Sequence, residues 1–436
     1  MASPTATRWT NWGGNQSCAP AAVIEPRTEE EIVAAVKQAA ERGQKVKVTA
    51  SGHSFTDIAC TDGVMLKLEA YNRVLAVDAE KMQVTVEAGI TINALCEELA
   101  RRGMAQPNLG DIGYQTISGA ISTATHGTGA TLTNISSQVV NMRLVLADGS
   151  VLEVAADKDL ATFKAAQVGL GALGVISTVT LQCVPQFRLH AVEDPRNIDD
   201  ILDNFEQLVA ENDHFEAYWM THTDRGIALM NNRTDEPLKP KGRVSGYIDD
   251  VLLENYAFGL VCRVGKLRPA WFPALNRFEA KLLSHSEFID RSDRVFINPR
   301  LVHFVEMEYA LPRAALPAAV REVRAMIERL GLNISFPVEL RAVAPDDITL
   351  STAHGRETSY VAVHVFRGMP YEEYFREVEA IMRGHEGRPH WGKMHYRTAA
   401  DLRPAYPKWD DFIAVRDRLD PERRFANAYL DRVLGP

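Results

Sequence analysis

Residues 106–134 read QPNLGDIGYQTISGAISTATHGTGATLTN, a stretch with a single acidic residue, Asp111, and no lysine or arginine. Glycine, serine and threonine dominate it, and a segment of this length with so little charge is seldom a solvated loop. Glycine lets a backbone approach a flat or charged ligand closely, and hydroxyl groups offer neutral hydrogen bonds to its polar edges. We therefore expect the stretch, and above all Thr125 to Gly129, to lie against another part of the protein or against a cofactor.

A second small-residue loop lies upstream, where Ala50-Ser51-Gly52-His53-Ser54 follows the run KVKVTA. The β-branched alternation of that run predicts a strand. Free backbone N–H groups at a strand end can wrap an anion such as a diphosphate. Taken alone, His53 in this loop is as readily a packed or surface histidine.

The elements around these two loops mix helices and strands without regular alternation, which indicates an α+β fold rather than a doubly wound sheet. Residues 28–43 predict a helix in which Thr28 caps the first turn and Glu31 reaches back to complete a capping box. Asp148-Gly149, between two alternating runs in 139–154, predicts a hairpin.

The composition changes near Pro185, after which aromatic residues, histidines and longer polar stretches are more frequent. We therefore predict three parts: a first domain over residues 14–185, a second domain over 186–390, and a C-terminal segment over 391–436. In the second part, residues 234–243 (TDEPLKPKGR) read as an exposed loop. Helices are predicted near 314–330 and 371–384, and strands at SFPVELRAV (335–343) and YVAVHVF (360–366).

Composition excludes several classes. The chain has 436 residues, 46% hydrophobic and 24% charged, with a net charge of −9, so it is long enough for a large core and is not disordered. The acidic balance argues against a nucleic-acid binder. Five widely spaced cysteines without a CxxC pattern predict reduced thiols, a cytoplasmic protein and no metal site. No apolar run is long enough to span a membrane.

The run Gly169-Leu-Gly171-Ala-Leu-Gly174 matches the GxGxxG dinucleotide pattern. That fingerprint requires a strand before it and a helix after it. Here a predicted helix precedes it and a predicted strand follows, so a tight turn is favoured and an NAD site is not.

Three features of the later sequence are candidates for chemistry. Glu339 and Arg341 stand two apart on a predicted strand and so share a face, although a surface ion pair would have the same pattern. His364 lies within an apolar strand, where a core histidine is the plain alternative. His390-Trp391-Gly392-Lys393 joins a possible acid–base group to a fixed cation, and an ordinary turn would read the same way.

Together these segments resemble a known family. The motifs are SGHSFTDIACTDGVML (51–66), PNLG (107–110) with SGAISTATHGTG (118–129), GALGVIS (171–177) and PHWGKMHY (389–396). They are similar, nearly end to end, to the aldonolactone oxidoreductases of the vanillyl-alcohol-oxidase-type flavoprotein superfamily. The resemblance implies a two-subdomain FAD-binding (PCMH-type) domain and an α+β cap domain with a large antiparallel sheet, with the C-terminal segment returning to the flavin.

The resemblance also implies roles for residues. Catalytic or substrate-binding roles fall to Glu339, Arg341, His364 and Lys393. FAD-binding roles fall to Ala50, Ser51, Gly52, His53, Ser54, Ser118, Gly119, Ser122, Thr123, His126, Gly127, Ile176 and His390. His53 matches the histidine that many members join covalently to the flavin, and Gly110 occupies the position of an oxygen gatekeeper. Phe366 and Asp111 depart from the alditol-oxidase pattern, which favours a lactone substrate.

The implied function is FAD-dependent oxidation of a sugar 1,4-lactone of the L-gulono, L-galactono or D-arabinono type at a carbinol carbon, with O₂ as acceptor and H₂O₂ as product. The resemblance leaves open a dehydrogenase that passes electrons to a cytochrome or quinone, and an alditol oxidase. An NAD dehydrogenase and a non-catalytic flavin-binding protein are further alternatives. Expected partners are a small sugar lactone or polyol and O₂ or another electron acceptor, without nucleic acid.

Overall fold

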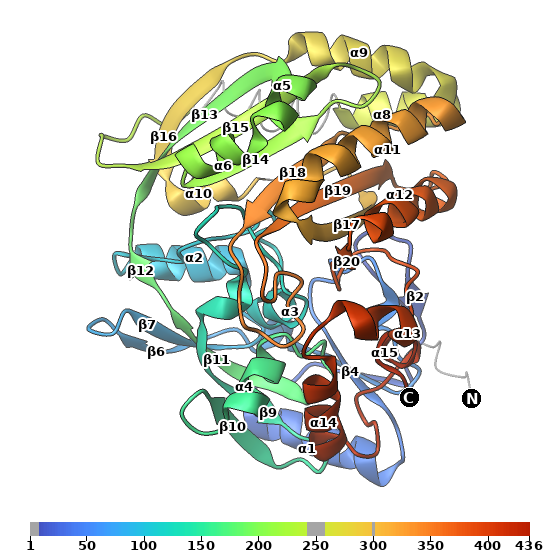
Figure 1. Ribbon diagram of the computed structural model, residues 1–436. Helices are drawn as coiled ribbons and strands as arrows, with labels where there is room; N and C mark the ends of the chain where they lie inside the picture. Colours follow the sequence, from blue (N-terminus) through green and yellow to red (C-terminus); the bar gives the residue numbers. More distant parts are fainter. Residues whose placement is uncertain (1–7, 242–257, 299–300) are drawn as a thin grey trace.

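The computed structural model describes residues 8–241, 258–298 and 301–436. Figure 1 shows a lower body built from the N-terminal half and the C-terminal helices, and an upper body in which one large sheet carries helices on its outer side. The α+β class is confirmed. The boundaries at 185 and 390 stay a prediction.

The first sheet of the lower body is parallel. Its order is β3 (Ala22–Ile24), β5 (Val64–Lys67) and β4 (Val46–Thr49). Helix α1 (Glu29–Glu41) precedes β4, and Thr28 caps it by accepting the N–H of Glu31. The predicted capping box is incomplete, because the Glu31 carboxylate accepts the N–H of Arg27 rather than that of Thr28.

The second sheet of the lower body is antiparallel, with order β10-β9-β11-β7-β6. Its strands are β6 (Val74–Asp78), β7 (Gln83–Glu87), β9 (Val139–Val145), β10 (Val151–Ala155) and β11 (Val175–Gln182). The hairpin predicted at Asp148-Gly149 joins β9 to β10. Helices α2 (Ile92–Ala100), α3 (Ile117–Ser122) and α4 (Leu160–Gln167) belong to the same body. Residues 169–174 form the turn from α4 into β11, so the order is the reverse of a dinucleotide fingerprint.

The upper body is built on an eight-stranded antiparallel sheet of order β16-β13-β15-β14-β18-β19-β17-β20, which confirms the predicted large sheet. The strands are β13 (Arg188–Asn197), β14 (His214–Trp219), β15 (Arg225–Thr234), β16 (Ser286–Arg291), β17 (Phe304–Pro312), β18 (Val338–Val343), β19 (Thr358–Phe366) and β20 (Arg388–Pro389). The predicted exposed loop begins as β15 ends, and residues 235–240 are exposed. Residues 242–243 of that prediction lie outside the described residues.

The two faces of this sheet differ because side chains alternate along each strand. Met307, Leu340 and Val363 belong to the apolar core of the upper body. That core includes residues of α5 (Ile198–Asp203), α6 (Phe205–Glu211), α11 (Leu316–Leu330) and α12 (Glu372–Gly384), the helices outside the sheet in Figure 1. The other face carries charged groups and turns toward the lower body.

The nearly uncharged stretch 106–134 lies against this sheet, as expected. The N–H of Gly129 donates to the carbonyl of Ala342 at 2.7 Å, and the Thr128 hydroxyl bonds the carbonyls of Phe215 and Ala342. Two strands of the upper body are thereby joined to the loop of the lower body.

The C-terminal segment returns to the lower body with α13 (Ala399–Leu402), α14 (Trp409–Leu419) and α15 (Ala428–Leu434). Helix α14 packs on α4, and the Asn427 amide donates to the carbonyls of Asp57, Ile58 and Cys60. The chain end therefore supports the segment that directly follows the His53 loop.

The other described helices of the upper body are α8 (Phe258–Leu267), α9 (Phe272–Leu282) and α10 (Ser292–Phe296). None of the helices in the described ranges has the length and apolar character needed to cross a membrane. All five cysteines are free thiols.

Candidate functional site

A first cavity, which we call the loop cavity, lies in the lower body between β4 and its following loop, helix α3 and the turn before β11. Ten of the predicted cofactor residues line it: Ala50, Ser51, Gly52, His53, Ser54, Ser118, Gly119, Ser122, Thr123 and Ile176. The two small-residue segments, about 65 positions apart in the sequence, thus face one space.

The loop conformation depends on Gly52, whose φ of +64° is a left-handed value that side chains disfavour. Its carbonyl accepts the N–H of Trp12 at 2.8 Å, and the Ser51 hydroxyl donates to the carbonyl of Tyr114. These bonds anchor the loop from two sides, and all five of its residues line the cavity.

His53 is a neutral, half-buried imidazole in this loop. Burial lowers its pKa to about 4, and the positive charge of Lys393 adds to the shift. Its Nδ1 atom is buried and has no hydrogen-bond partner among the described residues. Because a buried polar atom without a partner is costly, this nitrogen is suited to a bond with a bound molecule.

Lys47 is a buried lysine that sequence reasoning missed, and it also lines the loop cavity. Its ammonium donates to the carbonyls of Gly171 (3.3 Å) and Phe425 (3.1 Å). Burial lowers its pKa to about 7.

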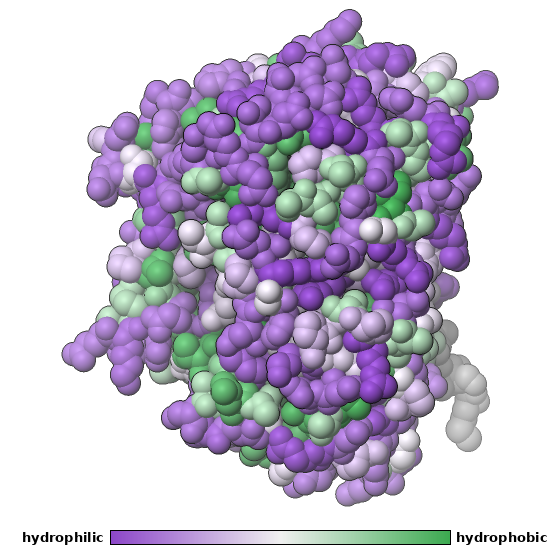
Figure 2. Space-filling model, viewed as in Figure 1, coloured by the Kyte–Doolittle hydropathy of each residue, from purple (hydrophilic) through white to green (hydrophobic). Residues whose placement is uncertain are grey.

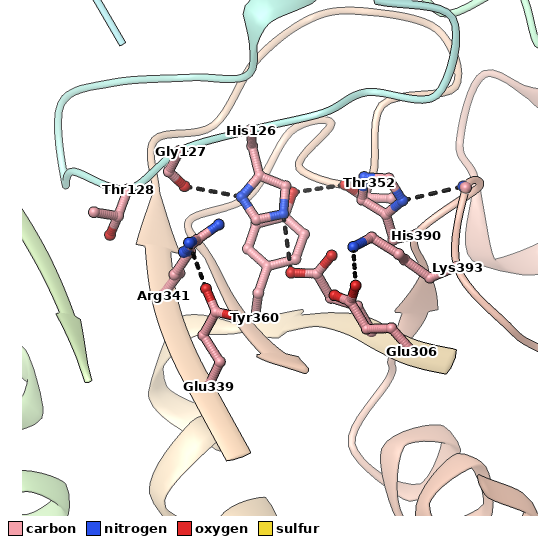
Figure 3. A network of polar contacts seen from close by, with 12 residues as sticks. His126, Gly127, Thr128, Glu306, Glu339, Arg341, Thr352, Tyr360, His390 and Lys393 are labelled. Atoms are coloured by element: carbon pink, nitrogen blue, oxygen red, sulfur yellow. Dashed lines mark hydrogen bonds and ion pairs between the residues drawn. The ribbon is translucent and has the colours of Figure 1, made fainter. Parts of the chain in front are cut away.

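A second cavity, which we call the charged cavity, lies between the lower body and the polar face of the large sheet. Its walls are residues of segment 110–126, of strands β14, β17, β18 and β19, and of the segment His390–Lys393. Figure 3 shows many of its side chains pointing toward one another from these separate elements. All four residues predicted as catalytic line it, together with Gly110, His126 and His390.

Five side chains form a continuous row along this cavity, which we call the charged row: Lys393, Glu306, His364, Glu339 and Arg341. Lys393 donates to Glu306, whose other oxygen lies 3.6 Å from His364 Nε2. On the far side, Glu339 lies 3.9 Å from the same Nε2 and 2.5 Å from Arg341. Cations therefore end the row and carboxylates flank the imidazole at its centre.

Strand register explains the row. Glu306 pairs with His364 across β17 and β19, and Glu216 pairs with Arg341 across β14 and β18. Directly opposite residues of antiparallel strands share a face. One face of the sheet thus collects charged groups from four strands.

Arg341 is surrounded by carboxylates. Besides Glu339, it contacts Glu216 at 2.7 Å and Asp111 at 3.7 Å. Burial raises the pKa of Glu339 to about 7. The positive charge of Arg341 lowers this pKa, and the negative charges of Asp111 and Glu216 offset part of that lowering. Glu339 therefore changes its charge near neutral pH, whereas Arg341 stays charged.

A second ion pair lies beside the row. His126 Nε2 is 3.2 Å from Glu308, and its Nδ1 is 2.9 Å from the carbonyl of Gly127. Both ring nitrogens thus face acceptors, and the ring stacks on Tyr360 at a centroid distance of 3.5 Å. Burial alone would raise the pKa of Glu308, but the neighbouring histidines and lysine hold it well below its usual range.

His126, Glu308 and His390 have possible ligand atoms within 4.8 Å of one another. The Nδ1 of His390 already accepts the N–H of Gly392 at 3.1 Å, so its Nε2 is the protonated nitrogen and is not a free ligand. Burial lowers the pKa of His390 to about 3. The cluster is better described as an ion pair beside a neutral imidazole than as a metal centre.

The two cavities meet near Gly392. A side-chain carbon there would lie 3.4 Å from Ser54 and Thr123 of the loop cavity and 3.4 Å from His390 of the charged cavity. Gln115 lines both cavities. A ligand extended along the loop cavity would therefore end beside the charged row.

Gly127 lines neither cavity, in contrast to the other predicted cofactor residues. A Cβ there would lie 2.2 Å from the carbonyl oxygen of Leu109, so this glycine allows two backbone segments to pack. Its contribution to the site is the carbonyl that fixes His126.

Sequence reasoning missed Glu306 and Glu308. Both are almost fully buried and stand two apart in the apolar run FVEMEYAL. The same spacing identified Glu339 and Arg341, so period-two alternation would have found this pair as well. No local sequence pattern indicated Glu216. It lies in the site because β14 pairs with β18 and places it opposite Arg341.

The loop cavity fits FAD. The small-residue lining can approach a dinucleotide closely, and the unpartnered His53 nitrogen and the nearby Lys47 offer it polar contacts. Residues 20–155 match the FAD binding domain family model, and residues 179–433 match that of D-arabinono-1,4-lactone oxidase.

Similar proteins cover almost the whole chain. L-gulono-1,4-lactone dehydrogenase of Mycobacterium tuberculosis is 47% identical over 98% of this chain and 99% of its own length. L-gulonolactone oxidase of Bos taurus is 35% identical, with 98% of each chain covered. Among solved structures, a solvent-stable cholesterol oxidase matches with a TM-score of 0.84 at 19% identity, over 98% of this chain and 97% of that one; this likeness concerns the fold alone.

Proposed function

This chain belongs to the D-arabinono-1,4-lactone oxidase family, and on that premise we propose that it oxidises a sugar 1,4-lactone at a carbinol carbon. FAD is its cofactor. The observation that carries the proposal is the charged row, which lines the cavity that shares Gln115 with the loop cavity. The expected substrates are L-gulono and D-arabinono lactones, which the names of the relatives print, and the related L-galactono lactone.

The loop cavity would hold FAD through the backbone and hydroxyl groups of segments 50–54 and 118–123. When bound, FAD supplies the hydride acceptor. The protein must orient the carbinol C–H bond and manage the charge that develops on its oxygen.

The charged row would manage that charge. Arg341 and Lys393 keep their positive charges and stabilise a developing alkoxide. His364 Nδ1 lies 3.4 Å from the carbonyl of Pro337, so Nε2 is the nitrogen left to accept the hydroxyl proton. Glu339, 3.9 Å away, then stabilises the imidazolium in its ionised form.

A substrate panel tests the proposal. Steady-state turnover with a dye acceptor should favour the 1,4-lactones over open-chain alditols. Preference for an alditol would instead support the alditol-oxidase alternative, against which the residues Asp111 and Phe366 argue.

Covalent FAD is the first specific prediction. His53 lines the loop cavity with a neutral imidazole whose Nδ1 has no hydrogen-bond partner among the described residues, and it should bond the flavin. After acid precipitation and a denaturing gel, flavin fluorescence should stay with the polypeptide and disappear in His53→Ala. His303→Ala is the matched control, since His303 stacks on the same Trp12 ring. Wild-type flavin that washes free would contradict the bond.

Oxygen is the proposed acceptor, and Gly110 is the residue that tests it. A Cβ at this position would lie 3.0 Å from the carbonyl oxygen of His126 and 3.5 Å from Thr125. An alanine methyl therefore requires the His126 carbonyl to shift by a few tenths of an ångström, and it adds bulk to the wall of the charged cavity. Gly110→Ala should slow reoxidation of the reduced enzyme by O₂ severalfold while leaving reduction by lactone unchanged, as measured by stopped flow.

A wild-type enzyme that O₂ fails to reoxidise would favour the alternative, a dehydrogenase that uses a cytochrome or quinone. The name of the Mycobacterium tuberculosis relative keeps this alternative open. We also propose a cytoplasmic location, which the five free cysteines support.

A further inference from the structure

Glu306 is a buried carboxylate that connects two of the residues predicted as catalytic. It lies on β17 with 4% of its surface exposed. One oxygen accepts a hydrogen bond from Lys393, and the other lies 3.6 Å from His364 Nε2. Lys393 comes from the C-terminal segment and His364 from β19, so a single side chain joins two separate parts of the site.

We propose that Glu306 is a positioning residue of the substrate site, which holds Lys393 and His364 together at the point where the substrate hydroxyl loses its proton. This inference rests on the proposed function. The sequence spacing of the four predicted catalytic residues does not explain how their side chains are held together. Glu306 explains it for two of them, because it contacts Lys393 and lies beside His364.

The link matters most for Lys393. Burial alone would lower the pKa of this ammonium, but the charges of Glu306 and Glu308 raise it above its usual value. The ionisable groups that bear on Lys393 are Glu306 and Glu308 on β17, Asp111 in segment 110–126, His53 in the loop, and the neighbouring His390. The ring of Phe55 also lies 5.3 Å from its nitrogen. Glu306 is the acidic group in direct contact.

The proton step balances within this arrangement. The substrate O–H proton moves to His364 Nε2, and the carbinol carbon loses its hydrogen as a hydride, for which FAD is the acceptor. The resulting imidazolium lies between Glu306 and Glu339, at 3.6 Å and 3.9 Å. Glu306 thus contacts the Lys393 ammonium and the His364 imidazolium at once, which keeps both cationic groups in place.

Glu306→Gln tests the proposal, because glutamine keeps the shape of the side chain and removes its charge. The kcat/KM for lactone should fall about 100-fold. Without the charge of Glu306, burial should lower the pKa of Lys393. The alkaline limb of the pH profile should therefore move to lower pH. Glu306→Asp should restore part of the alkaline limb, which a purely structural role would not predict.

Glu379→Gln is the matched control. Glu379 is a buried glutamate on α12 that accepts from the Tyr309 hydroxyl at 2.6 Å. Tyr309 belongs to the apolar core, so Glu379 lies on the helix side of β17. This variant should keep the wild-type pH profile.

A second measurement needs no substrate. Without Glu306, the folded-state pKa of Lys393 should fall below its unfolded value, so folding stability should rise with pH between the two values. The melting-temperature deficit of Glu306→Gln should therefore shrink between about pH 7 and 10. In a Lys393→Met background, this pH dependence should disappear.

The outcomes separate the two claims. Lactone turnover by the wild type with an unchanged profile in Glu306→Gln overturns the positioning role. A melting-temperature deficit that is equal at every pH, or that persists with Lys393→Met, overturns it as well. Absence of lactone turnover in the wild type overturns the proposed function, while the melting measurement still decides whether Glu306 and Lys393 act as a pair.

Discussion

Replacing Glu339 by glutamine should lower kcat for the lactone by about 10²- to 10³-fold while FAD remains bound. The carboxylate lies between Arg341 at 2.5 Å and His364 at 3.9 Å. Its removal leaves the imidazolium on His364 with one flanking carboxylate, and Arg341 with Glu216 and Asp111. Glutamine keeps the size of the side chain, so the loop cavity should bind FAD as before. Steady-state turnover, normalised to bound flavin, measures the loss.

The pH profile gives the same variant a sharper test. Burial raises the pKa of Glu339 to about 7, so the ionised form accumulates as pH rises through neutrality. Wild-type kcat/KM should therefore rise with pH through about 7, and this rise should be absent in Glu339→Gln. The control is Glu279→Gln. Burial also raises the pKa of Glu279 to about 7, but Glu279 lies on α9, away from both cavities. Wild-type turnover in Glu339→Gln would remove this residue from the site.

Replacing Arg341 by methionine should cost more, since it affects both activity and folding. Three carboxylates then lose their shared cation: Glu216, Glu339 and Asp111. We expect kcat/KM to fall about 10³-fold and the free energy of unfolding to fall by about 3–5 kcal/mol at neutral pH, as for other broken buried pairs.

The loss of stability in Arg341→Met should become smaller as pH falls. Without Arg341, the folded-state pKa values of the carboxyl groups rise, so stability should recover as pH falls and these groups gain protons. Urea denaturation at two pH values measures this. The control is Arg324→Met, because Arg324 pairs with the half-exposed Asp199 on the outer side of the sheet. Equal losses for the two arginine variants at both pH values would contradict the account.

Local sequence patterns predicted only some of the elements, and strands β13 to β17 of the large sheet were not among them. Alternation identified β18 and β19, and helical periodicity identified α11 and α12 to within two residues. Helix α11 begins at Leu316 rather than at 314, because residues 313–315 form a separate short turn before it. The capping box at Thr28 failed because a carboxylate can reach any nearby N–H, and Glu31 reaches that of Arg27.

The candidate site was predicted in its parts but not in its assembly. Motifs supplied Lys393 and His53, and spacing supplied Glu339 with Arg341. Strand register, which no local pattern reveals, placed Glu216 opposite Arg341 and Glu306 opposite His364. The large antiparallel sheet therefore decides which charges face one another, and the pKa of Glu339 follows first from its burial in this sheet.

Figure 2 shows that the outer surface of this view is mainly hydrophilic. The charged residues that matter for the proposed reaction are instead nearly all buried: Glu306, Glu339, Arg341 and His364 are each less than 9% exposed. Buried charges act far more strongly on one another than exposed ones. The net charge of −9 consequently says little about the chemistry.

Anaerobic mixing of the purified yellow holoenzyme with sugar 1,4-lactones tests the central claim most directly. The account predicts that the visible flavin absorbance bleaches with at least one of the L-gulono, L-galactono and D-arabinono lactones. Readmission of air should then restore the absorbance and yield H₂O₂. A holoenzyme that stays oxidised with every lactone would contradict the claim that this enzyme oxidises a sugar lactone beside the charged row.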